Sequence, residues 1–254
     1  MSCKVTELPL ELTLLSNPVK ELYYQGKPKL LENKKISIVG TRHPISYTKE
    51  SVAKLAAGLR KRKVCVVSGG AMGVDAIAHK NSFPFTIGIM ANSLDIVYPK
   101  VNYNLIKSMQ EDALLLSEYE KDHIARSYDF VLRNRIVVAL GEVLVIAEAD
   151  ENSGSIRSAE AALQQGKEIY VFPHRLNDSK GTNELLKRGL AKPIYDIEEF
   201  CDMFGKVDEN QDEFLKFCQD NSSLEKILDR FGDLLYEYEL DGKIKIENMK
   251  VIVV

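Results

Sequence analysis

Four short polar segments of the chain contain residue types that can bind phosphate, and each follows an apolar run. Backbone amides and hydroxyl groups in such segments bind anions without a large positive charge, particularly at a helix N-terminus. Three of the segments place glycine beside a hydroxyl residue. Several of them along one sheet edge suit a chain of phosphates better than a single nucleotide. The segments are Gly40-Thr41-Arg42, Ser68-Gly69-Gly70-Ala71-Met72-Gly73-Val74-Asp75, Ser117-Glu118-Tyr119-Glu120-Lys121 and Ser153-Gly154-Ser155.

The segment from Ser68 to Gly73 is similar to the dinucleotide-binding fingerprint Gly-x-Gly-x-x-Gly, but serine stands at the first glycine position. It also follows the second strand of the expected sheet. Asp95 is spaced like a ribose-binding acid but lies past an expected strand end. We therefore expect no nicotinamide or flavin cofactor. A further alternative is that these glycines only permit a tight turn.

A second pattern combines an aromatic residue with arginines inside an expected helix, where Phe130 precedes Arg133, Asn134 and Arg135. Single-stranded nucleic acids bind such surfaces, because aromatic rings stack on bases of any sequence, with about 1–3 kcal/mol per base. The alternative is that Phe130 belongs to the core and one arginine forms an internal ion pair. The residues alone leave both interpretations open.

The sequence contains no recognisable catalytic or metal-binding set. It lacks a Gly-x-Ser-x-Gly elbow and a Walker A motif, and its four cysteines and four histidines have no metal-ligand spacing. Glu118 and Glu148 fall at expected strand ends, where a general acid or base could lie. The residues leave an enzyme possible without supporting one, and we expect a binding protein without a cofactor or metal.

The fold is indicated by six short apolar runs that alternate with helical patterns, which is typical of a parallel sheet covered on both faces. Right-handed crossovers then predict an α/β doubly wound, Rossmann-like fold. The expected strands are 36–40, 64–67, 86–90, 113–117, 143–147 and 169–172, and the expected helices are 48–61, 74–79, 102–109, 128–140, the segment after Ser155 through Leu163, and 182–188.

Three domains are expected: a small helical lead-in over residues 1–30, a Rossmann-like domain over 31–205 and a small winged-helix-like domain over 206–254. The last has three helical patterns followed by two strand-like runs around Asp241-Gly242. It carries 7 basic and 12 acidic residues, which leaves 27 basic and 25 acidic residues for 1–205. The acidity thus lies mostly in the C-terminal segment, and the rest is free to form a local basic groove.

We expect a cytoplasmic protein with reduced cysteines. The first residues show no basic segment followed by an apolar stretch, and no run approaches the roughly 18 apolar residues of a membrane span.

An ordered set of motifs in this chain resembles the DNA-processing protein A (DprA/Smf) family. The set includes Gly40-Thr41-Arg42, the segment 68–75, Ser117-Glu118-Tyr119, Phe130 with Arg133-Asn134-Arg135, and Ser153-Gly154-Ser155. The resemblance covers about residues 36–190 and extends to the C-terminal segment. It implies single-stranded DNA binding across the Rossmann-like domain, a homodimer, and help in loading the RecA recombinase during natural transformation. The DNA path that it implies contains Arg42, Ser68, Gly69, Gly70, Lys121, Phe130, Arg133, Asn134, Ser153, Gly154 and Ser155.

Two other functions are weighed against this one. A nucleotide phosphoribohydrolase would also have glycine-rich loops over a Rossmann-like sheet. It would carry a Pro-Gly-Gly-x-Gly-Thr-x-x-Glu motif, to which Gly181-Thr182-Asn183-Glu184 is only loosely similar. A purely structural adaptor would leave the phosphate-type segments unexplained. The acidic C-terminal domain is better suited to a protein contact or a regulatory role than to DNA.

Overall fold

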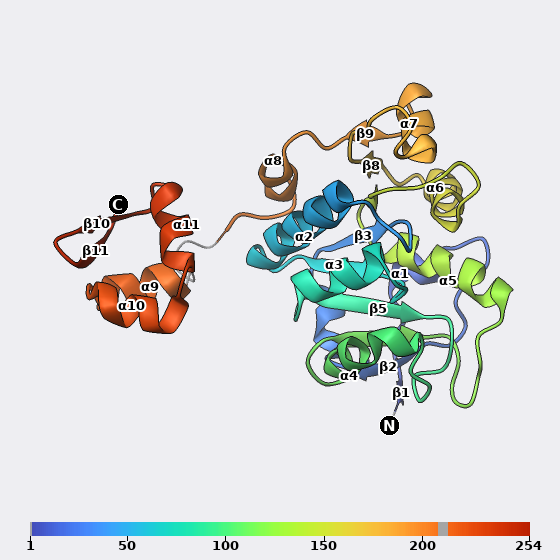
Figure 1. Cartoon of the computed structure of the whole chain (residues 1–254). Coiled ribbons are helices and arrows are strands. Elements are labelled where there is room, and N and C mark those ends of the chain that lie inside the picture. The colour runs from blue at the N-terminus through green and yellow to red at the C-terminus, as the bar shows by residue number, and fades with distance from the viewer. Residues whose placement is uncertain (1, 208–212) are drawn as a thin grey trace. The chain divides into compact units, whose positions relative to one another are not determined.

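The structure is a computed structural model that describes residues 2–207 and 213–254. By its internal contacts the chain divides into two compact units, Met1–Lys206 and Val207–Val254, which we call the larger unit and the C-terminal unit (Figure 1).

The larger unit is built on a nine-stranded sheet with the order β1-β2-β6-β5-β4-β3-β7-β8-β9. Neighbouring strands from β6 to β9 are parallel, whereas β1 and β2 are antiparallel additions at one edge. All six predicted strands are present. The strands are β1 (Cys3–Lys4), β2 (Tyr23–Gly26), β3 (Lys35–Val39), β4 (Cys65–Ser68), β5 (Thr86–Met90), β6 (Leu114–Ser117), β7 (Leu144–Ile146), β8 (Ile169–Val171) and β9 (Lys192–Pro193).

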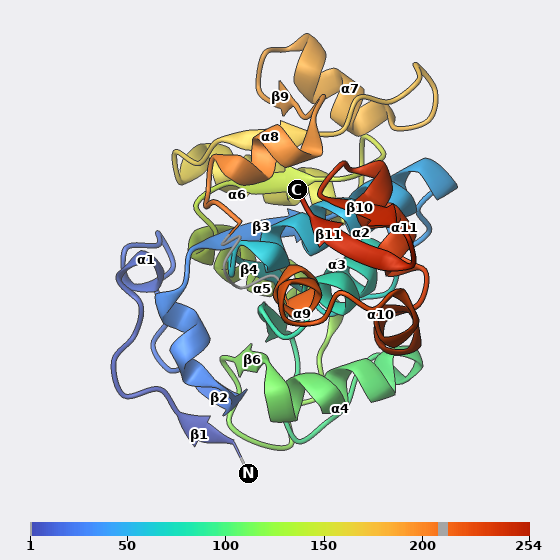
Figure 2. The same ribbon diagram turned by 90° about the vertical axis from the view of Figure 1, so that its left-hand side faces the viewer.

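Helices cover both faces of this sheet, because its central strands are apolar on both sides (Figure 2). In β4, Val66 packs on one face with α2, α3 and α8, whereas Val67 packs on the other with α1, α5 and α6. This arrangement confirms the predicted α/β, Rossmann-like fold. The helices are α1 (Leu10–Thr13), α2 (Ser46–Lys61), α3 (Val74–Ser82), α4 (Tyr103–Asp112), α5 (Ser127–Leu140), α6 (Gly154–Gln164), α7 (Lys180–Lys187) and α8 (Ile197–Asp202), with 3-10 turns η1 (Pro28–Glu32) and η2 (Lys100–Asn102).

The prediction of a helical lead-in over residues 1–30 is wrong for much of that segment. Only α1 is an α-helix there, while β1 and β2 extend the sheet. Tyr24 pairs with Leu116 in an antiparallel ladder. The physical reason is that the edge of β6 offers unpaired backbone groups, which the aromatic, β-favouring Tyr23-Tyr24 pair can satisfy. The helix α8 and the short strand β9 are further elements that the sequence patterns did not indicate.

The direction of chain progression across the sheet reverses between β3 and β7. From β3 the chain proceeds outward through β4, β5 and β6, then returns to place β7 on the other side of β3 and continues to β8 and β9. Loops at the carboxyl ends of β3 and β7 therefore diverge and leave a crevice, which is where doubly wound proteins bind ligands.

The C-terminal unit contains three helices followed by an antiparallel hairpin, as its sequence predicts: α9 (Glu213–Asp220), α10 (Leu224–Phe231), α11 (Leu234–Leu240), β10 (Ile244–Glu247) and β11 (Lys250–Val253). Its own small core includes Phe214, Ile227 and Leu235. Residues 208–212, at the start of the expected C-terminal domain, lie outside the described residues. Among the helices that the structure describes, none is long and apolar enough to cross a membrane.

Candidate nucleic-acid interface

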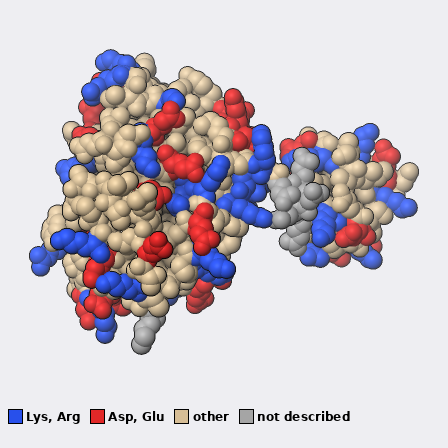
Figure 3. All heavy atoms as spheres, turned by 180° about the vertical axis from the view of Figure 1, so that it is seen from behind, with Lys and Arg blue, Asp and Glu red and all other residues tan. Residues whose placement is uncertain are grey.

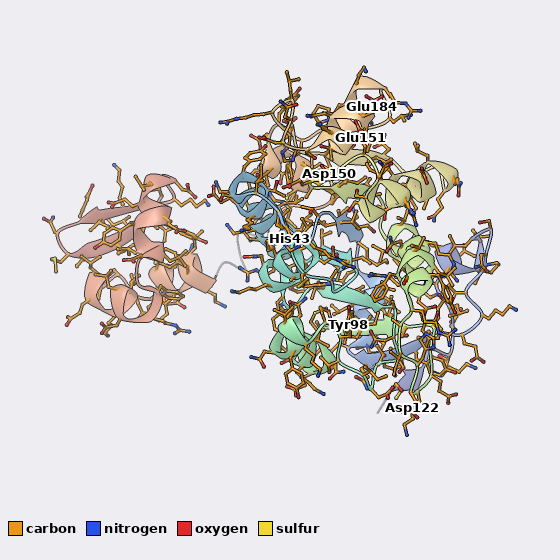
Figure 4. The ribbon with its side chains drawn as sticks, turned by 45° about the vertical axis from the view of Figure 1, so that its right-hand side comes forward. His43, Tyr98, Asp122, Asp150, Glu151 and Glu184 are labelled. Atoms are coloured by element: carbon orange, nitrogen blue, oxygen red, sulfur yellow. The ribbon has the colours of Figure 1, made fainter. Side chains whose placement is uncertain are left out.

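A groove of about 630 Å³ lies over the carboxyl ends of the parallel strands in the larger unit. The strand order β5-β4-β3-β7 places the loops after these strands side by side, and α5 forms one wall. Tyr98, labelled in Figure 4, lies on the β5 side, whereas the start of α6 lies on the β7 side. The lining residues are Val39, Gly40, Thr41, Arg42, Gly69, Ala71, Asp75, Tyr98, Ser127, Phe130, Val131, Arg133, Asn134, Val137, Ser153, Gly154, Ser155 and Ser158.

The end of the groove on the β7 side is the N-terminus of α6, which we call the hydroxyl end. Ser153 occupies the N-cap position, but its side chain makes no capping bond, and its buried Oγ has no partner among the described residues. The first backbone amides of a helix have no acceptor within the helix. A Cβ on Gly154 would meet no atom within 4 Å, so this end is open to a ligand. An uncapped helix N-terminus beside hydroxyl groups can bind phosphate.

The other end, which we call the aromatic end, contains the rings of Tyr98 and Phe130. Their centroids lie 5.8 Å apart with the planes tilted by 53°, and Tyr98 is 48% exposed. A small pocket next to the two rings is lined by Met72, Met90 and Ala91. Phe130 is only half-buried and faces this pocket and the groove, which favours the stacking interpretation over a core position.

Arg133 lies in the floor of the groove and not on its surface. It is 6% exposed, and its Nη1 donates a hydrogen bond to the carbonyl oxygen of Ile89 at 2.9 Å. Burial lowers the pKa of this guanidinium, while nearby Asp75 opposes that shift. Its Nε is buried without a partner among the described residues. The arginine that forms an internal ion pair, as the alternative interpretation allowed, is Arg135, whose Nη2 lies 2.6 Å from a Glu118 oxygen.

The glycine-rich loop after β4 uses its own polar groups internally. The Ser68 side chain is fully buried and donates to the carbonyl oxygen of Ile38 at 2.7 Å. The amides of Gly69 and Ala71 donate to the same Asp75 oxygen at 3.1 and 3.2 Å. The Ser68 hydroxyl and the amides of Gly69 and Ala71 are therefore already engaged within the protein. Gly69 and Gly70 still line the groove and the adjoining pocket.

The loop after β6 does not bring Lys121 into the groove. Lys121 is exposed, lies 3.9 Å from an Asp122 oxygen and is not among the lining residues. Figure 4 labels Asp122 on this loop, well away from Tyr98. Buried Asp129 holds the loop by accepting from Tyr119 OH, His123 Nε2 and the Arg126 amide, at 2.8, 3.0 and 2.7 Å.

The groove is only weakly positive. Among the described residues that line it, the cationic ones are Arg42, exposed on its rim, and Arg133, in its floor, and the acidic one is Asp75. On the face in Figure 3, positive and negative side chains are interspersed. Residues 60–63, at the end of α2, are all basic. This basic stretch is not part of the groove lining.

The two glutamates at strand ends make contacts that stabilise the fold. Glu148 is 7% exposed and accepts from the amide of Ile45, and Glu118 pairs with Arg135.

Three polar lining residues lie outside the segments identified from the sequence, namely Tyr98, Ser127 and Ser158. Of these, Tyr98 had a signal, because an aromatic residue in a polar loop after a buried strand is a candidate for stacking. By contrast, the structure brings Arg42, Gly69, Phe130, Arg133, Asn134, Ser153, Gly154 and Ser155 together as expected.

Comparisons with known proteins give a consistent result. Residues 2–205 match the model of the family described as DNA recombination-mediator protein A. DNA processing protein DprA of Bacillus subtilis is 34% identical over 199 residues, which are 76% of this chain and 67% of that protein. Its Streptococcus pneumoniae relative is 33% identical over 186 residues, 71% of this chain and 66% of that protein. The chain thus spans about two thirds of the length of these relatives.

Solved structures agree with this match. DNA processing protein A from Helicobacter pylori, studied for its single-stranded DNA binding mode, has 42% identity and a TM-score of 0.78, covering 80% of this chain and 94% of that one. DprA from Streptococcus pneumoniae has 30% identity and a TM-score of 0.74, covering 81% and 75%. The chain belongs to the DNA recombination-mediator protein A family, also called DprA/Smf.

Proposed function

We propose that this protein binds single-stranded DNA in the groove without regard to base sequence. The observation that carries the proposal is the pairing of a hydroxyl end at the start of α6 with an aromatic end at Tyr98 and Phe130. Phosphate contacts and stacking are the two interactions by which proteins bind single strands of any sequence. The single-stranded DNA bound by the Helicobacter pylori relative supports this choice of ligand.

The charge of the groove predicts how this binding depends on salt. Of its two cationic side chains, only Arg42 is exposed, so contact with one phosphate gives a slope of the logarithm of the binding constant against the logarithm of the salt concentration of about −0.7. The protein then relies on stacking and on desolvated hydrogen bonds more than on counterion release. Duplex DNA binds more weakly, because its paired bases cannot stack on Tyr98 and Phe130.

The family also suggests a biological role. We propose that the protein acts in the cytoplasm as a recombination mediator that binds without catalysing a reaction. In this role it protects incoming single strands and helps to load the RecA recombinase during natural transformation, as a homodimer. The family name, which specifies a recombination mediator, supports this role.

The C-terminal unit has a separate role in this proposal. Residues 206–254 carry 12 acidic and 7 basic residues, so contact with phosphates is unfavourable. We propose that this winged-helix-like unit contacts a protein or regulates binding.

The test is fluorescence anisotropy of a labelled single-stranded oligonucleotide titrated with the full chain at two salt concentrations. We expect saturable binding that is similar for mixed and homopolymeric sequences and weaker for the matching duplex. Absence of binding at low salt, or tighter binding of the duplex, would contradict the proposal. Sedimentation of the protein and its mixture with RecA tests the homodimer and the recombinase partner.

A further inference from the structure

The ring of Tyr98 lies on the loop after β5, residues 91–99, whereas Phe130 lies on α5, so the spacing of the two rings depends on how this loop is held relative to that helix. Among the described residues no hydrogen bond joins the loop directly to α5. Both are bonded instead to the loop after β6, residues 118–126. That loop is not part of the groove lining, yet it links the two halves of the aromatic end.

The backbone of His123 makes the first half of this link. Its carbonyl oxygen accepts from the amide of Ser93 at 3.1 Å, and its own amide donates to the Ser93 Oγ at 3.0 Å. The Ser93 side chain is fully buried. The amide of Asp122 adds a bond to the Asp95 carboxylate at 3.3 Å. The loop after β6 is thus fastened to the loop that bears Tyr98.

The imidazole of His123 makes the second half. Its Nε2 lies 3.0 Å from Oδ2 of Asp129, which immediately precedes Phe130 in α5. Burial opposes ionisation of Asp129, but bonds from the Arg126 amide, Tyr119 and His123 hold its pKa below the ordinary value. An ionised carboxylate only accepts hydrogen bonds, so His123 Nε2 carries a proton and donates. The Tyr119 ring stacks on the imidazole, with centroids 3.6 Å apart, and fixes its plane.

We propose that His123 is a positioning residue for DNA binding, which holds Tyr98 and Phe130 at the spacing that stacks a base by joining the loop of the first to Asp129. Its side chain is bonded to Asp129 and is not in the groove lining, so it acts without touching the strand. This assignment rests on the proposed function, since both rings belong to the same groove. Residues that bind a ligand keep their geometry through such supporting hydrogen bonds. Loss of the imidazole should therefore reduce only the part of the affinity that comes from bases.

Anisotropy titrations of the full chain with two labelled strands of equal length test this role. One strand consists of thymidine nucleotides, and in the other abasic nucleotides replace them. The wild type should bind the thymidine strand more tightly, because only bases stack on the rings. His123→Ala is expected to weaken binding of the thymidine strand about fivefold, the lower end of what one stacked base contributes, and to leave the abasic strand unchanged. Equal losses for the two strands would mean that His123 only supports the fold, and would overturn the proposal.

Three further variants test the link itself. His123→Gln keeps a nitrogen donor for Asp129, so it should bind both strands within about twofold of the wild type. Ser93→Ala weakens the other half of the link and should also reduce the preference for the thymidine strand, which keeps the test valid if His123→Ala does not fold. His174→Ala is the matched control, because this half-buried histidine donates to the carbonyl oxygen of Ala147 at 2.8 Å on the β7 side of the sheet. Its preference between the strands should equal that of the wild type, and a loss as large as that of His123→Ala would overturn the proposal.

A double variant shows whether the effect passes through the ring. If His123 acts by positioning Tyr98, His123→Ala combined with Tyr98→Ala should bind the thymidine strand as Tyr98→Ala alone does, because coupled residues are not additive. A further loss in the double variant would contradict this role. If the wild type prefers the thymidine strand and His123→Ala retains that preference, the positioning role fails while the proposed function stands. If the wild type binds neither strand, both fail.

Discussion

The guanidinium of Arg133 lies so close to Gly69 that a Cβ on Gly69 would fall 1.6 Å from its Nη1. The same Nη1 donates to the carbonyl oxygen of Ile89, which fixes the guanidinium between β5 and the loop after β4. Gly69 is therefore required for the approach of a buried side chain. The glycine-rich loop contributes to the groove by admitting Arg133 to its floor, while the amides of Gly69 and Ala71 donate to Asp75.

This contact predicts that Gly69→Ala destabilises the larger unit. The new methyl group must displace Arg133 and break its bond to Ile89, which we expect to cost about 1–3 kcal/mol in the free energy of unfolding. Urea denaturation followed by circular dichroism measures this cost. Gly154→Ala is the matched control, because its Cβ meets nothing within 4 Å, and its effect should stay within about 0.5 kcal/mol. Equal costs for the two variants would contradict the account.

Arg42 is expected to affect binding without affecting stability. It is exposed on the rim of the groove, so Arg42→Ala should weaken single-stranded DNA binding and reduce the magnitude of the salt slope by about 0.7. Anisotropy titrations at several salt concentrations measure both effects, and the melting temperature should stay unchanged. Arg60→Ala removes another exposed arginine, from the basic stretch 60–63, and serves as the control. If Arg60→Ala weakened DNA binding more than Arg42→Ala does, the DNA would bind at the basic stretch and not in the groove.

His79 predicts the acid sensitivity of the larger unit. Its side chain is fully buried, and burial, aided by the charge of Arg133, lowers the pKa of His79 from 6.5 to about 3. The neutral form is thus favoured in the folded state. Its contribution to stability is complete above pH 6.5 and is lost as the pH falls from 6.5 toward 3, by up to about 1.4 kcal/mol per pH unit.

Urea denaturation between pH 7 and pH 4 should therefore show a flatter acid limb for His79→Gln than for the wild type. The exposed His43→Gln serves as the control, and its limb should match that of the wild type. Parallel limbs for His79→Gln and the wild type would mean that His79 titrates normally in the folded protein.

The cysteines are expected to differ strongly in reactivity. Burial raises the pKa of Cys65 and Cys201 to about 12, and Cys218 is also buried, whereas Cys3 is exposed. Because the thiolate is the reactive form, a disulfide-exchange reagent at pH 8 should modify one thiol rapidly in the native protein and all four after denaturation. Mass spectrometry of the early product should place the modification on Cys3. Rapid modification of Cys65 or Cys201 would contradict their burial.

Much of the fold could be predicted because the central strands are buried on both faces. A strand such as Leu144–Ile146 reads as an uninterrupted apolar run, and its neighbours show the same pattern. The lead-in could not be predicted in this way. Strand β2 exists because it pairs with β6, a contact between residues about 90 positions apart that no local pattern records.

The site was predictable to the extent that it depends on strand order. Segments at the carboxyl ends of adjacent parallel strands must meet, so Arg42 and Ser153 were correctly brought together. Phe130 joins them from α5, which forms one wall of the groove. Burial of individual groups was not predictable. An arginine or a serine in a loop or helix pattern has the same sequence signature whether it faces solvent or, like Arg133 and Ser68, lies in the interior.

The most direct measurement is photocrosslinking of an iodouridine-substituted single strand to the full chain, with the crosslinked residues identified by mass spectrometry. The account predicts crosslinks at Tyr98 and Phe130, because stacked bases lie against these rings. The crosslinks should disappear when unlabelled strand is added in excess. Crosslinks confined to the basic stretch 60–63 or to the C-terminal unit, with none in the groove, would contradict the claim that the groove binds DNA.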